Sequence, residues 1–326
     1  MTRQLLRDAS QTSLTLFKII VPISLATRVL QHWGVIDYLG DFLAPLMEVV
    51  GLPGPVALVW ASAIMTNIYG GLVVFASLGS NLELTVAQVS VLGTMILVAH
   101  ALPVETLIAR RAGARLRFTL VIRLFGALLT GWLLNNIYQI TGYLQQPNQV
   151  AWAPPVVEAT WQAWLFAELR NMVLIFLIIL SLLTLLTILK QLGVISLITR
   201  LLAPLLNLLG ISGEAAPITI IGMTLGLSYG GGLIIREAQS GKLAARDLFA
   251  SVTFMGLCHS IFEDTMLVMI MGAHISAVLW FRLIFALIVI YVLMKIINLL
   301  PPKMISSYMF YSGGVVNPEH NKTISR

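Results

Sequence analysis

Apolar runs long enough to cross a lipid bilayer recur along this chain, since about 20 consecutive apolar residues span the hydrocarbon core. Four of these runs are uninterrupted, and they predict spanning helices at about 13–33, 117–140, 171–191 and 278–299. Two more runs, about 85–111 and 244–272, are broken near their centres by polar residues. The pattern predicts an all-α polytopic membrane protein.

Two shorter kinds of element lie between the spanning runs. The stretches 36–50 and 195–209 are amphipathic and too short to cross the bilayer, so we expect helices that lie in the interface. The apolar stretches 55–78 and 216–238 each contain a polar, glycine-rich break. Such a break fits either a kinked spanning helix or a re-entrant hairpin.

The positions of Lys and Arg favour the hairpin. If each half crosses the membrane three times, the basic residues, including the cluster from Arg110 to Arg117, all face the cytoplasm. A spanning helix at 55–78 would place that cluster outside, against the positive-inside rule. We therefore expect six crossings, two re-entrant hairpins and both termini in the cytoplasm, in a multi-pass protein of the bacterial inner membrane.

The two halves carry the same short sequences in the same order. Tyr69-Gly70-Gly71 recurs as Tyr229-Gly230-Gly231, at a separation of 160 residues, whereas His100 and most other matched positions recur 159 residues later. Three crossings per copy invert the second copy relative to the first. The predicted organisation is a first repeat at 1–141, an extracytoplasmic linker at 142–162, an inverted second repeat at 163–303 and a mobile cytoplasmic tail at 304–326.

The composition agrees with a membrane protein. Hydrophobic residues make up 58% of the chain, charged residues 10%, and the mean hydropathy is +0.91, which leaves too little polar surface for a soluble protein. The single cysteine, Cys258, excludes an intrachain disulfide. The net charge of +6 bears mainly on orientation, and we expect no nucleic-acid partner and no cofactor.

Ionisable groups near the middle of the bilayer carry the candidate chemistry, because they are costly there and usually functional. They lie in the breaks of the two interrupted runs, where the alternative is one structural histidine–carboxylate network per half. With the polar residues of the hairpin breaks, the candidate substrate-binding residues are Thr66, Asn67, Tyr69, His100, Glu105, Thr106, Ser228, Tyr229, His259, Glu263, Asp264 and Thr265, with Gly70, Gly71, Gly230 and Gly231 at the hairpin tips.

Several of these residues also have a structural explanation. Glycines allow close helix packing, and threonines bond to backbone carbonyls of their own helix. Arg123 and Arg282 match each other by position, and we expect both to anchor helix ends at the interface.

An interfacial helix, a hairpin with Tyr-Gly-Gly and a broken helix with His and an acid together resemble the nucleoside-recognition (Gate) domain family. That family includes the spore maturation proteins A and B and units of the membrane part of ferrous-iron permease B. Its architecture is similar to that of concentrative nucleoside transporters. The resemblance covers about 14–300 as two Gate-like units, and it implies that hairpin tips and broken helices enclose one small polar molecule. The longer Gln-Thr-Glu hairpin tip of those transporters is absent here.

The favoured function is secondary transport of a small polar solute, coupled to H⁺ or Na⁺, with the binding site at the midplane of the lipid bilayer. The resemblance implies that the solute is nucleoside-like. A divalent-metal permease is one alternative, because two histidines, three carboxylates and Cys258 offer a mixed ligand set, although no metal site is assigned. A membrane partner protein without transport is another, and self-association into a homo-oligomer is left open. An enzyme is not expected, because Ser260 and His259 are adjacent and adjacent helical residues point apart.

Overall fold

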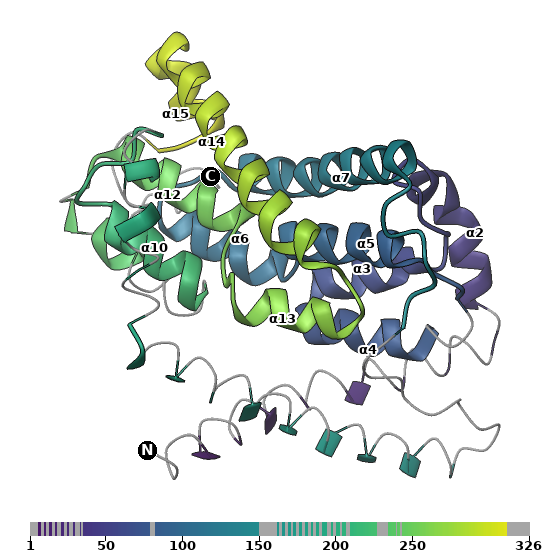
Figure 1. The fold of residues 1–326 in the computed structure, drawn as a ribbon. Coiled ribbons are helices and arrows are strands. Elements are labelled where there is room, and N and C mark those ends of the chain that lie inside the picture. Colours follow the sequence, from purple (N-terminus) through teal and green to yellow (C-terminus); the bar gives the residue numbers. More distant parts are fainter. Residues whose placement is uncertain are drawn as a thin grey trace, which may run out of the picture. The chain divides into compact units, whose positions relative to one another are not determined.

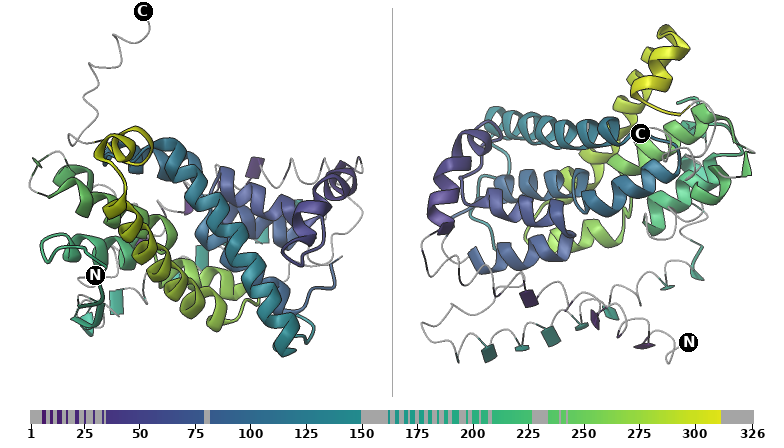
Figure 2. Two further views of the ribbon diagram at one scale, coloured as in Figure 1. Left: turned by 90° about the horizontal axis from the view of Figure 1, so that it is seen from above. Right: turned by 180° about the vertical axis from the view of Figure 1, so that it is seen from behind.

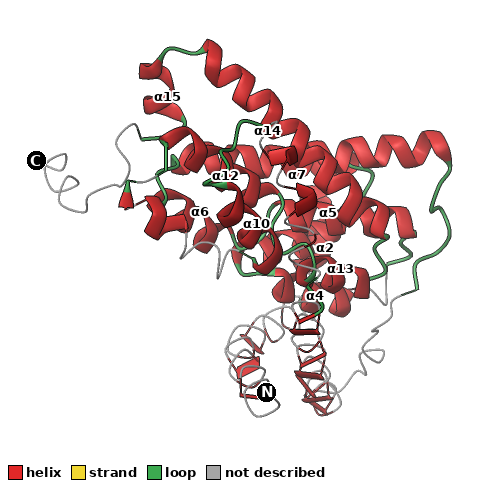
Figure 3. Cartoon of the chain, turned by 60° about the vertical axis from the view of Figure 1, so that its left-hand side comes forward, coloured by secondary structure: helices red, strands yellow, loops and turns green. Residues whose placement is uncertain are grey.

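The computed structural model describes residues 35–78, 82–149, 209–226, 234–238 and 243–311, together with isolated positions within 6–33, 162–206 and 240–241. Over these residues the chain forms helices and loops, and its β-type pairing is limited to two isolated bridges (Figure 3). The predicted all-α class is therefore confirmed for this part of the chain.

The helices follow the predicted apolar runs closely. In chain order they are α2 (Val35–Glu48), α3 (Val56–Met65), α4 (Ile68–Leu78), α5 (Val86–Val98), α6 (Leu102–Arg111), α7 (Leu116–Thr141), α10 (Ala216–Leu225), α12 (Ala245–Leu257), α13 (Glu263–Ile270), the π-helical turn η2 (Ser276–Phe281), α14 (Arg282–Leu299) and α15 (Pro302–Tyr308) (Figure 1). The first of them, α2, occupies the predicted interfacial stretch.

Three helical stretches among the described residues are long and apolar enough to cross a membrane: Val86–Arg111, Leu116–Thr141 and Ser276–Leu299. They correspond to three of the predicted spanning runs. Two other predicted spans, 13–33 and 171–191, lie mostly outside the described residues, as does the second interfacial stretch, 195–209.

The apolar stretch 55–78 folds back on itself as a helical hairpin, with Thr66 and Asn67 between α3 and α4. In one continuous helix, Val59 and Gly71 would lie about 18 Å apart along the axis. A Cβ atom placed on Gly71 would instead lie 3.3 Å from the carbonyl oxygen of Val59. The two helices therefore run side by side (Figures 1 and 2), and the kinked-helix alternative is wrong. That the hairpin re-enters the membrane from one side remains a prediction.

The hairpin packs tightly because its facing surfaces are small and apolar. Gly71 lies against Ala63, so that an added Cβ atom would approach the Ala63 Cβ to 2.9 Å. Side chains too small to separate two helices let their backbones approach closely, which is how helices commonly associate in membranes. Beyond the contact between α3 and α4, the hairpin also packs on α2, α5 and α13.

The chain divides into two compact units, and each unit takes segments from both halves of the sequence. Unit 1 comprises Met1–Ala101, Leu128–Val194 and Glu263–Val278, whereas unit 2 comprises Leu102–Ala127, Ile195–Phe262 and Leu279–Arg326. In each half, one boundary between the units falls inside an interrupted run. In the first half it lies between α5 and α6, and in the second half between α12 and α13. Each predicted repeat therefore contributes to both units.

α15 and the residues that follow it are held against the loop between α6 and α7 in unit 2. Arg115 donates from Nε and Nη2 to the carbonyl oxygen of Ser306, at 3.0 and 2.6 Å. Its guanidinium group also lies 3.6 Å from the centre of the Tyr311 ring, and Phe310 beside it is buried. Residues 304–311, predicted to belong to a mobile tail, are instead fixed by these contacts.

Arg115→Ala is expected to release residues 306–311 from this loop. The change removes two hydrogen bonds and a cation–π contact, which together contribute about 2 kcal/mol. Amide hydrogen exchange of residues 306–311 should then become faster, whereas Arg117→Ala, an exposed arginine two residues away, should leave it unchanged. Equal exchange in both variants would contradict this account of the contact.

Candidate functional site

Both interrupted runs unwind in the same local conformation. α5 ends at Val98 and α12 ends at Leu257, and beyond them Ala101 and Ser260 each have a φ angle of +47°. This left-handed backbone is costly for a residue with a Cβ atom, and such strain concentrates at functional sites. The predicted breaks are confirmed, and the strained residues occupy matched positions in the two halves.

One backbone hydrogen bond ties each break to the end of a neighbouring helix. In unit 1 the N–H of Ala101 donates to the carbonyl of Ala63 near the end of α3, at 2.9 Å. In unit 2 the N–H of Ile261 donates at the same distance to the carbonyl of Met223 near the end of α10. Carbonyls in the last turn of a helix lack partners within the helix and form its partially negative end. Each break is therefore fixed beside the carboxyl-terminal end of a second helix.

Both histidines of the breaks are held in one tautomer. His100 Nδ1 lies 2.9 Å from the carbonyl oxygen of Ile96, and His259 Nδ1 lies 2.8 Å from that of Met255. Because a carbonyl oxygen can only accept, Nδ1 carries the hydrogen in both rings. The other nitrogen of each ring, Nε2, faces a carboxylate.

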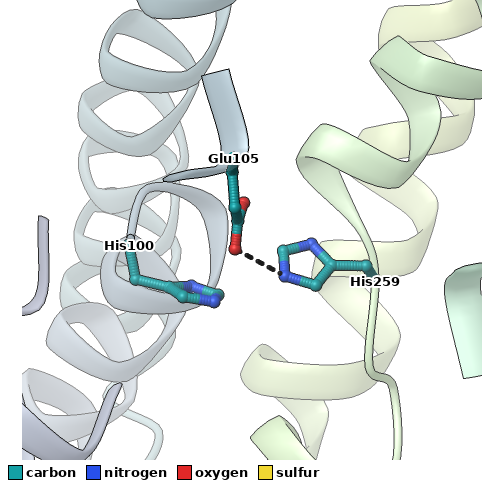
Figure 4. A group of neighbouring side chains, drawn as sticks. All are labelled: His100, Glu105 and His259. Carbon is teal, nitrogen blue, oxygen red and sulfur yellow. Dashed lines mark ion pairs between the residues drawn. The ribbon is translucent and has the colours of Figure 1, made fainter. Parts of the chain in front are cut away.

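In unit 2 this carboxylate is Glu105, which is bound from two sides. His259 Nε2 lies 3.1 Å from Glu105 Oε1 (Figure 4), and Arg123 Nη1 donates to Oε2. A second arginine, Arg282, donates from Nη2 to the backbone carbonyl of His259 at 2.9 Å. All four side chains are buried, so they form a charged network shielded from solvent.

In unit 1 the acids come from α13 and meet residues of α4 and the first break. His100 Nε2 lies 3.6 Å from Asp264 Oδ2, and the Tyr69 hydroxyl donates to Glu263 Oε1 at 3.3 Å. His100 and Asp264 are buried, whereas Tyr69 and Glu263 are half-buried. Four predicted site residues are thus brought together in this unit.

The paired histidines and acids come from opposite halves of the sequence. Glu105 of the first half pairs with His259 of the second, and Asp264 of the second half pairs with His100 of the first. Each of these two contacts therefore joins the two halves, whereas the predicted alternative was a network within each half. The pairs exist, but each is completed by the other half.

Other predicted site residues have structural roles that the geometry makes plain. Thr66 and Thr106 donate their hydroxyls to backbone carbonyls one turn earlier, and Asn67 Oδ1 accepts from the N–H of Gly70 in the first turn of α4. Gly70 and Gly71 lie in the first turns of α4 rather than in the turn itself. The Thr265 hydroxyl is buried and has no hydrogen-bond partner among the described residues.

The second hairpin tip lies outside the described residues. This applies to four candidates, Ser228, Tyr229, Gly230 and Gly231. The helix before this predicted tip, α10, is described and ends at Leu225. Gly226 caps it with a φ angle of +83°, which a glycine adopts without strain.

The prediction that Arg123 and Arg282 anchor helix ends at the interface is wrong. Arg123 is 1% exposed and Arg282 is fully buried, and both contact residues of the candidate site. Their repetition at the common separation of 159 residues was the available signal, because a snorkelling side chain has no reason to recur at a fixed position in both halves.

Comparison with known proteins gives one family match. Residues 13–115 match the Gate family, described as nucleoside recognition. The Gate match includes α2 to α6, and thus the hairpin and the first break. It lies within the first of the two predicted Gate-like units, and the second remains a prediction.

A curated relative extends the similarity over most of the chain. The uncharacterized membrane protein YvoD of Bacillus subtilis (strain 168) is 28% identical over 280 residues, which cover 83% of this chain and 87% of the relative. No solved structure matches the chain. The relative and the apolar helices indicate a membrane protein, and the Gate match implies a transport-related role rather than that of an enzyme.

Proposed function

We propose that this protein is a secondary transporter of a small polar solute, driven by protons that bind at its histidine–carboxylate pairs. The observation that carries the proposal is the Nε2-to-carboxylate contact at both breaks, 3.1 Å for His259 with Glu105 and 3.6 Å for His100 with Asp264. Ionisable groups at membrane depth commonly serve as proton relays in transporters.

The hydrogen-bond pattern supports proton binding directly. Since Nδ1 already carries a hydrogen that it donates to a backbone carbonyl, a neutral ring presents the lone pair of Nε2 to the carboxylate. An ionised carboxylate also presents lone pairs, and the two groups then repel each other. One additional proton, on either group, turns this repulsion into a hydrogen bond. Each pair is therefore a binding place for one exchangeable proton.

Unit 1 supplies groups that suit a polar solute. Tyr69 and Glu263 are half-buried, offer a hydroxyl and a carboxylate, and lie beside the hairpin turn. A nucleoside-like solute carries hydroxyl and ring N–H groups that such side chains bind, in keeping with the Gate description. Broken helices in secondary transporters hold substrate and coupling ions near the bilayer midplane. We place the solute at the contact between α4 and α13. The protein itself would cross the bacterial inner membrane six times.

The geometry of unit 2 speaks against a divalent-metal permease. Arg123 is hydrogen-bonded to Glu105, and a guanidinium group in contact with a carboxylate repels a metal cation at the same oxygens. A proton that binds at His259 Nε2 leaves Glu105 ionised and hydrogen-bonded to Arg123, whereas a metal ion would need the carboxylate oxygens themselves. The proton-driven carrier is therefore the better-supported candidate.

Reconstitution of the full-length protein in liposomes tests the proposal. Nucleosides, nucleobases and amino acids would be added in turn while a trapped pH-sensitive dye reports proton movement. At least one solute is expected to move protons, and Asp264→Asn should reduce the rate about tenfold or more, equivalent to roughly 1.4 kcal/mol. The matched control is Glu214→Gln, an exposed acid in unit 2. Solute uptake that moves no protons and is unaffected by Asp264→Asn would overturn the proposal.

A further inference from the structure

Arg282 is a fully buried cation whose hydrogen-bonding capacity is mostly unused. Its Nη2 donates to the carbonyl of His259, but Nε and Nη1 have no hydrogen-bond partner among the described residues. None of the ion pairs among those residues includes Arg282. A buried charge without a counter-charge is strongly unfavourable, so binding of an anion at this guanidinium group would stabilise the protein.

The unused hydrogens form one complete edge of the guanidinium group. Nη2 carries two hydrogens, one directed toward the Nε side and one toward Nη1. His259 uses one of them. If the carbonyl takes the hydrogen on the Nη1 side, the remaining Nη2 hydrogen is parallel to the unused N–H of Nε. If it takes the hydrogen on the Nε side, the remaining one is parallel to an unused N–H of Nη1. Two parallel N–H donors match the two oxygens of a carboxylate or phosphate group.

The charge balance of unit 2 leads to the same conclusion. Its buried, formally charged side chains among the described residues are Arg123, Arg282 and Glu105, two cations and one anion. Glu105 is hydrogen-bonded to Arg123. Within unit 2, one positive charge therefore remains without a counter-charge among the described residues, and it is the charge on Arg282. The remaining buried acid of the described residues, Asp264, belongs to unit 1 and contacts His100.

The backbone before Arg282 also differs from that before its counterpart. Arg123 lies within the regular α-helix α7, whereas Arg282 directly follows the π-helical turn η2. π-helical turns are rare and occur frequently at functional sites. The irregular turn thus accompanies the arginine whose hydrogens are unused, not the one that is bound to Glu105.

We propose that Arg282 is the binding residue of an oxyanion site at the break that follows α12. It would bind a carboxylate or phosphate group through two parallel hydrogen bonds. This site goes beyond the proposed proton-driven transport and does not depend on it. Its occupant carries the oxyanion either as a free solute or as a lipid headgroup, and the chemistry of recognition is the same for both.

Binding to the purified full-length protein tests this site without any transport assay. In a non-ionic detergent at constant ionic strength, sodium acetate and sodium phosphate are expected to raise the melting temperature of the natural protein by about 3 °C or more. Acetamide, which has the shape of acetate without its charge, should have no effect. Arg282→Gln should abolish the rise. Lys295→Gln, which removes an exposed positive charge from the same helix α14, should retain it.

A second variant keeps the test decisive if Arg282→Gln does not fold. Arg282→Lys retains the charge but loses the paired donors, so acetate should bind about tenfold more weakly than to the natural protein. Equal affinity in Arg282→Lys and the natural protein would overturn the two-bond recognition.

Lipid nanodiscs distinguish the two sources of the oxyanion. If the occupant is a lipid headgroup, discs with anionic phosphatidylglycerol should stabilise the natural protein more than zwitterionic discs, and Arg282→Gln should remove the difference. If the occupant is a free solute, the acetate and phosphate shifts should persist in zwitterionic discs. The site does not exist if the natural protein and Arg282→Gln respond equally to acetate, phosphate and anionic lipid.

Discussion

Glu105→Gln is expected to cost about 3–5 kcal/mol of folding free energy, because it leaves a buried arginine without its counter-charge. The carboxylate of Glu105 is bound to Arg123 and lies 3.1 Å from His259 Nε2, and all three side chains are buried. Glutamine keeps the shape of the side chain but not the charge. The guanidinium group of Arg123 would then remain in a medium that solvates it poorly.

The melting temperature of the protein in detergent measures this cost, and a fall of roughly 10 °C is expected for Glu105→Gln. Glu83→Gln, at an exposed acid in the loop before α5, is the matched control and should melt with the natural protein. The double variant Glu105→Gln with Arg123→Met should recover most of the loss, since it removes the charge that lacks a partner. A double variant no more stable than Glu105→Gln alone would contradict the pairing.

Gly71→Leu is expected to open the α3–α4 hairpin and to destabilise the protein by about 3 kcal/mol. Even a single Cβ atom at this position would approach Ala63 Cβ to 2.9 Å and the Val59 carbonyl oxygen to 3.3 Å. Part of this obstruction is backbone, which cannot rotate away as a flexible side chain can. The helices must separate, and Tyr69 on α4 would then move relative to Glu263.

Thermal unfolding and solute-driven proton flux together measure this effect. Gly213→Leu is the control, because a Cβ atom at Gly213 would meet nothing within 4 Å. The expected result is a lower melting temperature and reduced flux for Gly71→Leu only. A Gly71→Leu protein with the stability of the control would show that α3 and α4 do not pack as described.

The hairpin and the breaks could be predicted from the sequence because local chemistry determines them. Thr66 and Asn67 interrupt an apolar run with residues that bond to nearby backbone, and the charge asymmetry of the flanking loops argued against a straight crossing. The break after α5 was likewise visible as polar residues in a run that is otherwise apolar. Each of these signals lies within a few residues of the feature that it predicts.

The pairing of the site residues could not be predicted, because it joins positions from opposite halves. His100 and Glu105 are close in sequence and are both flanked by apolar residues, so a network within one half was the natural expectation. Nothing in the spacing indicates that Asp264 and His259 are their actual partners. The buried arginines were missed for a related reason. Arg123 lies near the cluster that ends at Arg117, which suggested a position near the membrane surface.

The exchange of partners between halves has a consequence for biosynthesis. While the ribosome is still extending the chain, the first half enters the lipid with His100 and Glu105 before residues 259–264 exist. Amino-terminal domains generally fold first during synthesis, but neither histidine–carboxylate pair can form until most of the polypeptide has been translated. The early helices must therefore remain in place with an incomplete interior until α12 and α13 have been synthesised.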